Sequence, residues 1–294
     1  DGGQNTCAAR TLARMNERGI DSKLRILAAD ALEGASDTLV ALASGTLSAA
    51  LIRGVYSPEQ VAHFVARLER GEFPADFRIR DVPDPSVSQI RTLGLAVSPS
   101  DLSPRGPELD AYHAAAVDFR QRAEGFFAPA PAFPETAQRV LAALSGVPVE
   151  LATDERGRPY GALTIRNMPP GSGLPPHCEN HYMHIPVYDA LRRRVHLAQK
   201  IGFFCVLQLP SAGGRFVVYD DAYEPGEFAF QTRSLDIVPD RPCVVVPALP
   251  GDMVVLASGA RYHQVTRVEG QRGRWSVGGF GAFASDMTRF FSWA

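Results

Sequence analysis

The chain has 294 residues, a net charge of −2 and 45% hydrophobic residues, which is ordinary for one large globular domain or two small ones. No basic excess favours nucleic acid or an anionic membrane surface, and no apolar run reaches the roughly 18 residues of a membrane span. The 4 cysteines are scattered, so we expect no disulfide framework and a reducing, cytoplasmic location.

The first half of the chain is expected to be mainly helical. Residues 23–45 are rich in Ala and Leu and end at a glycine, which predicts a helix that stops there. A short strand-like run follows over residues 49–57. The next helix is predicted to begin after Ser57, because Ser57 can act as N-cap and Gln60 can close a capping box. Two more helices are predicted over residues 106–127 and 133–146.

From Val147 onward the pattern changes to short runs of Val, Ile, Phe and Tyr between Pro and Gly turns. The expected strands cover residues 147–153, 160–168, 201–209, 214–220, 243–249, 252–258 and 273–283. Short strands at this spacing predict a sandwich or barrel. We therefore predict an α+β fold with a cupin-like jelly-roll core over residues 147–294 and a helical N-terminal layer over residues 1–146. No flexible linker separates the halves, so a single domain over residues 1–294 is expected.

Polar side chains crowd together in PPHCENHYMH, residues 175–184. In an extended segment residues two apart share a face, so His177 and Glu179 aim at one point while Cys178 aims away. His263, which lies between two strand-like runs, supplies a third donor. Two histidines and one carboxylate that leave coordination positions open are typical of non-heme Fe(II) centres that activate O2.

An arginine and a hydroxyl follow His263 in the next strand-like run. Arg274 and Ser276 stand two apart, and a guanidinium beside a hydroxyl suits bidentate capture of a carboxylate. His-x-Glu, a distant His and Arg-x-Ser together resemble the 2-oxoglutarate/Fe(II)-dependent oxygenase superfamily. The order of these motifs and the glycine pair in SAGGRFVVYD are most similar to its prolyl-hydroxylase-type branch. The resemblance covers residues 159–283.

The resemblance implies a double-stranded β-helix core in which His177, Glu179 and His263 bind Fe(II). It also implies that Arg274, helped by Ser276, binds the distal carboxylate of the cosubstrate 2-oxoglutarate, with O2 as the second cosubstrate. Iron halogenases of the superfamily have Ala or Gly at the carboxylate position, where chloride binds. Glu179 therefore predicts oxygenation or desaturation without halogenation.

Three features depart from the family pattern. The usual acid is Asp, whereas this chain has Glu179. Many relatives have a Tyr that reaches 2-oxoglutarate from the strand before the metal loop; here Asn167 is expected at that place, with Arg166 as its neighbour. The interval between the two metal-binding histidines is also long for the branch. We expect the surplus in residues 181–195 and 220–240, as insertions that cover the substrate.

Some nearby residues compete for these roles. His181 and His184 lie in the same cluster, and pocket, hydrogen-bonding and plain surface roles all stay open for them. Arg272 is the competitor of Arg274. We favour Arg274, because the residue two positions after Arg272 is an arginine and not a hydroxyl.

The sequence therefore predicts an Fe(II)/2-oxoglutarate-dependent oxygenase. We expect it to hydroxylate, desaturate or cyclise an unactivated C–H bond of a small molecule in secondary or amino-acid metabolism. No nucleic acid or membrane partner is expected, and a homodimer is compatible with the sequence. Two alternatives stay open: a cupin-like metal-dependent isomerase or binding module without 2-oxoglutarate, and a hydroxylase of peptide or protein side chains.

Overall fold

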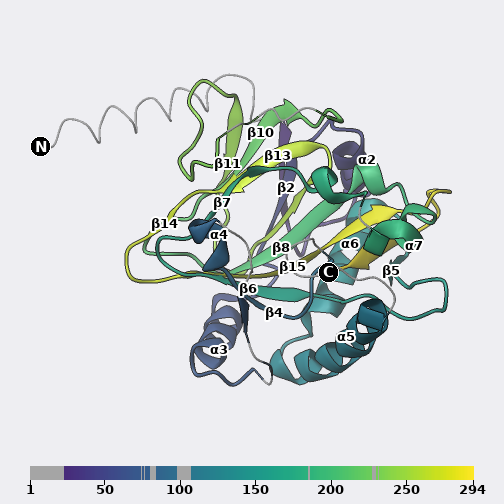
Figure 1. Cartoon of the computed structure of the whole chain (residues 1–294), viewed down its shortest axis with the longest axis horizontal. Helices are drawn as coiled ribbons and strands as arrows, with labels where there is room; N and C mark the ends of the chain where they lie inside the picture. The colour runs from purple at the N-terminus through teal and green to yellow at the C-terminus, as the bar shows by residue number, and fades with distance from the viewer. Residues whose placement is uncertain are drawn as a thin grey trace, which may run out of the picture.

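The computed structural model describes residues 23–294, apart from residues 74, 76, 80–83, 98–106, 185, 227–229 and 231. Two β-sheets face each other, and helices cover the outer face of the larger sheet (Figure 1). The main path of the larger, ten-stranded sheet runs β1 (Leu24–Ala28), β2 (Ala49–Arg53), β12 (Met253–Leu256), β8 (Ile201–Gln208), β15 (Arg274–Phe283), β6 (Thr164–Met168), β4 (Arg91–Leu93) and β3 (Arg78–Ile79). Beside β15 it is joined by β16 (Phe290–Trp293) and β5 (Val149–Leu151).

The smaller sheet has four strands and carries two of the predicted metal-binding residues. Its order is β11 (Cys243–Val246), β10 (Phe216–Ala222), β13 (Arg261–Val265) and β7 (Leu174–His177). A separate pair joins β14 (Val268–Glu269) to β9 (Ala212–Gly213). All seven strand-like runs predicted after Val147 contain a strand. The two facing sheets agree with the predicted jelly-roll core.

The helices are α2 (Thr38–Ala43), α3 (Pro58–Glu69), α4 (Pro85–Ser88), α5 (Pro107–Phe126), α6 (Phe133–Ser145) and α7 (Asp189–Arg192). The capping box predicted at the start of α3 is present. The Gln60 backbone N–H donates to Ser57 Oγ over 3.3 Å, and the Ser57 N–H donates to Gln60 Oε1 over 2.8 Å. None of the described helices is long and apolar enough to cross a membrane.

Both faces of the larger sheet are buried at its central strands β8, β12 and β15, and alternate residues of each strand supply the two faces. In β12, Met253 and Val255 belong to the core cluster formed with helices α3 and α6, whereas Val254 and Leu256 belong to the cluster formed with β10 and β11. Figure 1 shows α3 and α5 on the side of the larger sheet away from β7, β10 and β13. Apolar side chains from both sheets therefore pack against one another between them.

The single helix predicted over residues 23–45 is wrong. The chain forms strand β1, then a turn, and only then the six-residue helix α2. Strand β1 pairs in parallel with β2, and β2 pairs with β12 of the C-terminal half. Backbone pairing at the sheet edge outweighs the helix propensity of an Ala- and Leu-rich segment, because propensity is only a weak preference. The first half thus adds strands at both ends of the larger sheet, besides its helices.

Candidate metal centre

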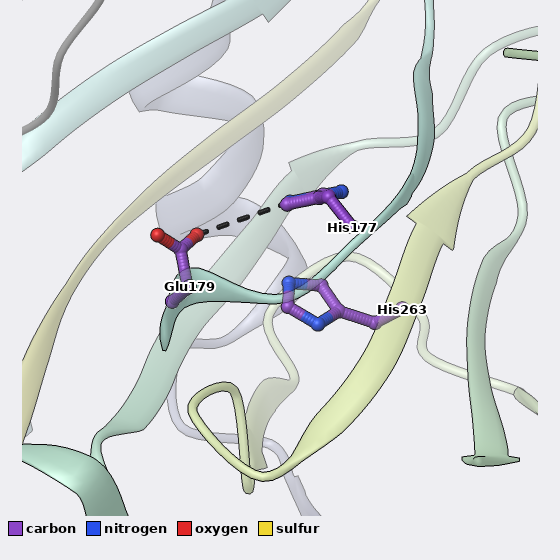
Figure 2. A group of neighbouring side chains, drawn as sticks. All are labelled: His177, Glu179 and His263. Atoms are coloured by element: carbon purple, nitrogen blue, oxygen red, sulfur yellow. Dashed lines mark ion pairs between the residues drawn. The ribbon is translucent and has the colours of Figure 1, made fainter. Parts of the chain in front are cut away.

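Three donor side chains converge between the sheets (Figure 2). His177 ends β7 and His263 lies in β13, where antiparallel pairing sets the two residues opposite each other with ring centroids 4.3 Å apart. Glu179 begins a short 3₁₀ helix, Glu179–Tyr182, and its Oε1 lies 3.8 Å from His177 Nε2. One ligand atom from each residue lies within 4.8 Å of the others, a spacing that one metal ion can bridge.

Backbone carbonyls orient both imidazoles. His177 Nδ1 lies 2.8 Å from the Pro175 carbonyl oxygen, and His263 Nδ1 lies 3.1 Å from that of Arg261. A carbonyl only accepts hydrogen bonds, so each Nδ1 carries the hydrogen and each Nε2 keeps its lone pair. Fixing the other ring nitrogen in this way is how proteins aim metal-binding histidines.

The alternation predicted for the metal loop is present. Cys178 has an extended backbone and is fully buried on the far side of the loop, where its thiol donates to the Gly259 carbonyl over 3.1 Å. The Glu179 N–H donates to the Ser258 carbonyl over 3.0 Å. A Cβ at Gly259 would lie 2.8 Å from Asn180 Oδ1, too close for any residue but glycine. The loop is thus fastened tightly to the turn after β12.

The charges at the centre favour metal-binding protonation states. Burial, followed by the neighbouring His177, lowers the pKa of His263 to about 3, so its imidazole is neutral at pH 7. Burial alone would raise the pKa of Glu179, but His177, Lys200 and other positive groups bring it below its usual value. A neutral imidazole and an ionised carboxylate are the forms that bind a divalent cation. The donor set therefore fits Fe(II).

Lys200 is a buried cation behind this centre that the sequence analysis missed. Only 1% of its surface is exposed, and its Nζ donates to the Tyr188 hydroxyl over 3.2 Å. Burial lowers the pKa of Lys200 to about 8, while Glu179 acts in the opposite direction. Lysine is rarely buried, but nothing in its sequence neighbourhood signals the burial.

Arg274 and Ser276 line the same cavity as the three donors. Arg274 is 3% exposed and donates from Nη1 to Ser276 Oγ over 3.3 Å, with its guanidinium 5.2 Å from the Phe204 ring centroid. Burial, and next the charge of Arg166, lower the pKa of Arg274 to about 10. Its competitor Arg272 is exposed and lines a different, outer hollow. Of the two arginines, Arg274 thus lines the cavity of the three donors, and Arg272 lines the outer hollow.

Asn167 is not at the cavity, contrary to the sequence-based prediction. It lies in the outer hollow with Trp275, its pairing partner in β15, whereas its neighbour Arg166 lines the cavity. Successive side chains of a strand point to opposite faces, so a placement wrong by one residue selects the wrong face. Because both faces of β6 are covered, its burial does not alternate, and the sequence carries no signal to correct the choice.

The two insertions are also placed differently from the prediction. None of their described residues, within 181–195 and 220–240, lines the cavity. Tyr188 and Leu191 are buried in a core cluster, and the Phe230 ring packs between Tyr219 and Tyr262. His184 is exposed, and the His181 side chain lies outside the described structure. The described parts of these segments pack on the core and do not form the cavity wall.

Comparison with known families and structures gives one family match. A family model described as carrier-protein-independent halogenase WelO5 matches residues 23–294. No curated protein matches the chain significantly.

Solved structures agree with the observed fold. An N-substituted L-amino acid dioxygenase from Burkholderia ambifaria AMMD superposes with a TM-score of 0.53 and 16% identity, covering 87% of this chain and 91% of that one. A non-heme alpha-ketoglutarate-dependent epimerase, SnoN from nogalamycin biosynthesis, gives a TM-score of 0.50 and 15% identity, covering 83% and 85%. At such low identity these likenesses support the fold alone.

Proposed function

Since this chain belongs to the family described as carrier-protein-independent halogenase WelO5, and is thereby a 2-oxoglutarate-dependent non-heme iron enzyme, we propose that it oxygenates or desaturates an unactivated C–H bond of a small molecule. The observation that carries this proposal is Glu179, whose carboxylate converges with His177 and His263. The proposed enzyme therefore uses the metal and cosubstrate of its family, but it oxygenates or desaturates its substrate and does not halogenate it.

Glu179 distinguishes the proposed oxygenation or desaturation from halogenation. A halogenating centre needs a position where a halide can bind the metal, and in the superfamily that position is vacated by Ala or Gly. Here a carboxylate occupies it, and the lowered pKa of Glu179 means that the carboxylate is negatively charged at pH 7. A chloride ion would meet both a filled position and a like charge. Oxygenation or desaturation is thus the outcome that the donor set favours.

Each part of the cavity has a task in this proposal. His177, Glu179 and His263 would hold Fe(II), and Arg274 with Ser276 would hold the distal carboxylate of 2-oxoglutarate. Iron, 2-oxoglutarate and O2 supply the oxidising power when bound, with succinate and CO2 as coproducts. The apolar rings of Phe204 and Phe216 wall the cavity and exclude water from the reacting groups.

The alternatives are less well supported. Membership in a 2-oxoglutarate-dependent family sets aside a cupin-like isomerase or binding module that lacks this cosubstrate. A hydroxylase of peptide side chains would need an open groove. The cavity here is lined by strands of both sheets, and its wall combines aromatic and aliphatic side chains with a few polar groups, which suits a small molecule better.

An anaerobic titration of the metal-free protein with Fe(II) and 2-oxoglutarate tests the proposal. We expect a weak visible charge-transfer band in the wild type, its loss in His263→Ala, and its retention in the matched control Arg272→Ala. Succinate release in air, with a panel of small molecules, then reports turnover. A wild type that binds Fe(II) but develops no band with 2-oxoglutarate would contradict the proposed site.

A further inference from the structure

A row of four side chains crosses the larger sheet at the outer hollow. Asn167 of β6 pairs with Arg91 of β4 on one side and with Trp275 of β15 on the other. Trp275 pairs in turn with Gln208 of β8, and all four residues line the hollow. The next outward-facing residue of β6, Ile165, belongs to the apolar core beneath the helices. The outer face of the sheet therefore changes from apolar to polar at this row.

The Asn167 carboxamide is the buried polar group of the row. Only 9% of this residue is exposed, and its carboxamide has no hydrogen-bond partner among the residues that the structure describes. A carboxamide has two N–H donors and a carbonyl acceptor, and buried groups of this kind nearly always find a partner. Gly273, which also lines the hollow, has no side chain to cover it, since a Cβ there would lie 3.2 Å from Asn167 Nδ2. The unused donors and acceptor are thus presented to the hollow.

Two aromatic rings stand beside this carboxamide in the wall of the hollow. The ring centroids of Trp275 and Phe77 lie 5.8 Å apart, with an angle of 45° between the ring planes. Trp275 is buried and held in the core cluster, whereas Phe77 is exposed. A planar ligand gains a large contact area from such rings, and a nearby polar group fixes its orientation.

Positive charge is in excess in the wall. Arg91 and Arg272 both line the hollow, and neither guanidinium has an ion-pair or hydrogen-bond partner within the described residues. Glu69 is the one acidic side chain in the described wall, so two cations face one anion. Arg91 is the direct neighbour of Asn167 across the pairing of β4 with β6. A guanidinium and an amide N–H side by side suit the two oxygens of a carboxylate.

We propose that the outer hollow is a second binding site, which takes a small aromatic carboxylate. The ring of the ligand lies against Trp275 and Phe77, and its carboxylate accepts hydrogen bonds from Asn167 and Arg91. An aliphatic acid would leave the rings without a contact, and a neutral aromatic would leave the guanidinium without a counter-charge. The hollow lies on the face of β6 and β15 opposite to the metal centre. The site therefore does not depend on the proposed reaction.

Binding of 4-nitrobenzoate to the metal-free full chain tests this site. Calorimetry gives the dissociation constants, and tryptophan fluorescence reports where the ring binds, because a nitroaromatic ring in contact with an indole quenches its emission. The chain has 2 tryptophans, and Trp293 is fully buried in a separate core cluster, so contact quenching reports on Trp275. Two matched ligands complete the set: 4-nitrobenzyl alcohol has the ring without the charge, and acetate has the charge without the ring.

The wild type should bind 4-nitrobenzoate at least about tenfold more tightly than either matched ligand, with loss of tryptophan emission. Arg91→Met should remove the preference for the acid over the alcohol. Asn167→Asp keeps the shape of the side chain but sets a like charge before the carboxylate, so it should abolish binding of the acid and retain the alcohol. Arg274→Met, the control for the cavity between the sheets, should bind both as the wild type does.

Other results would overturn the proposal. One is a wild type that binds the acid and the alcohol equally, or binds neither. Another is a preference for the acid that survives in Arg91→Met and Asn167→Asp but is lost in Arg274→Met, since the acid would then lie in the cavity between the sheets. A thermal melt checks that each variant is folded. Should Asn167→Asp fail to fold, the exposed Arg91 decides, because its loss removes no core contact.

Discussion

Strands β6 and β15 present two faces that differ in chemistry although they share one backbone. On the inner face Arg166, Arg274 and Ser276 meet the cavity, and on the outer face Asn167 and Trp275 line a hollow on the other side of the sheet. Residues adjacent in sequence thus belong to different sites. The comparison teaches that in a sheet covered on both faces, polarity alone does not tell which side chain is functional.

The largest effect is expected when one of the metal-binding side chains facing the cavity is removed. His263→Ala should abolish succinate release, because a centre with one histidine and one carboxylate is a poor iron site. The fold should survive, since the two sheets are held by their apolar core and do not depend on a metal. Succinate assays and a thermal melt measure the two effects. Full activity in His263→Ala would exclude this residue as a ligand.

The carboxylate position decides the reaction type. Glu179→Gly should lose most oxygenation and open a position that a halide can enter. Mass spectrometry of products formed in high chloride, once a substrate is identified, measures this change. The unmodified protein should give no chlorinated product under the same conditions. If it does, Glu179 is not an iron ligand and the three-residue site must be reassigned.

Arg274, in β15, and Arg272, just before it, are expected to differ in their effect on 2-oxoglutarate binding. Arg274→Ala should raise the 2-oxoglutarate KM by at least about tenfold, because a charge-assisted bidentate pair contributes about 1.5–3 kcal/mol. The exposed Arg272 should tolerate alanine with a much smaller change. Steady-state kinetics with varied 2-oxoglutarate give both values. The reverse ranking would show that the wrong arginine has been assigned.

The smallest expected effect lies on the outer face. Asn167→Ala should leave the 2-oxoglutarate KM within about twofold of the wild type, because the side chain is separated from the cavity by the sheet itself. Because Asn167 is buried, any loss of stability is measured separately from the change in KM. The same kinetic assay and a thermal melt suffice. A tenfold rise in KM would mean that the two faces communicate through β6.

Local patterns predicted those parts of the molecule that depend on local interactions. The capping box of Ser57 and Gln60, the helix that follows it and the strand runs after Val147 are all present. Helix starts and strand alternation are set within a few residues, so the sequence carries their signal. The convergence of His177 and Glu179 was predictable for the same reason, since two-residue spacing in an extended segment fixes a shared face.

The features that local patterns did not predict depend on pairing between segments that are distant in the sequence. The parallel pairing of β1 with β2 turned a helix-like sequence into a sheet edge, and the register of β6 against β15 chose Arg166 over Asn167 for the cavity. Equally, only the tertiary structure set His263 opposite His177 and buried Lys200 behind Glu179. Sequence by itself determined which donors this protein has and how neighbours alternate. Which face each strand turns inward depends on partners far along the chain, and no local pattern records that choice.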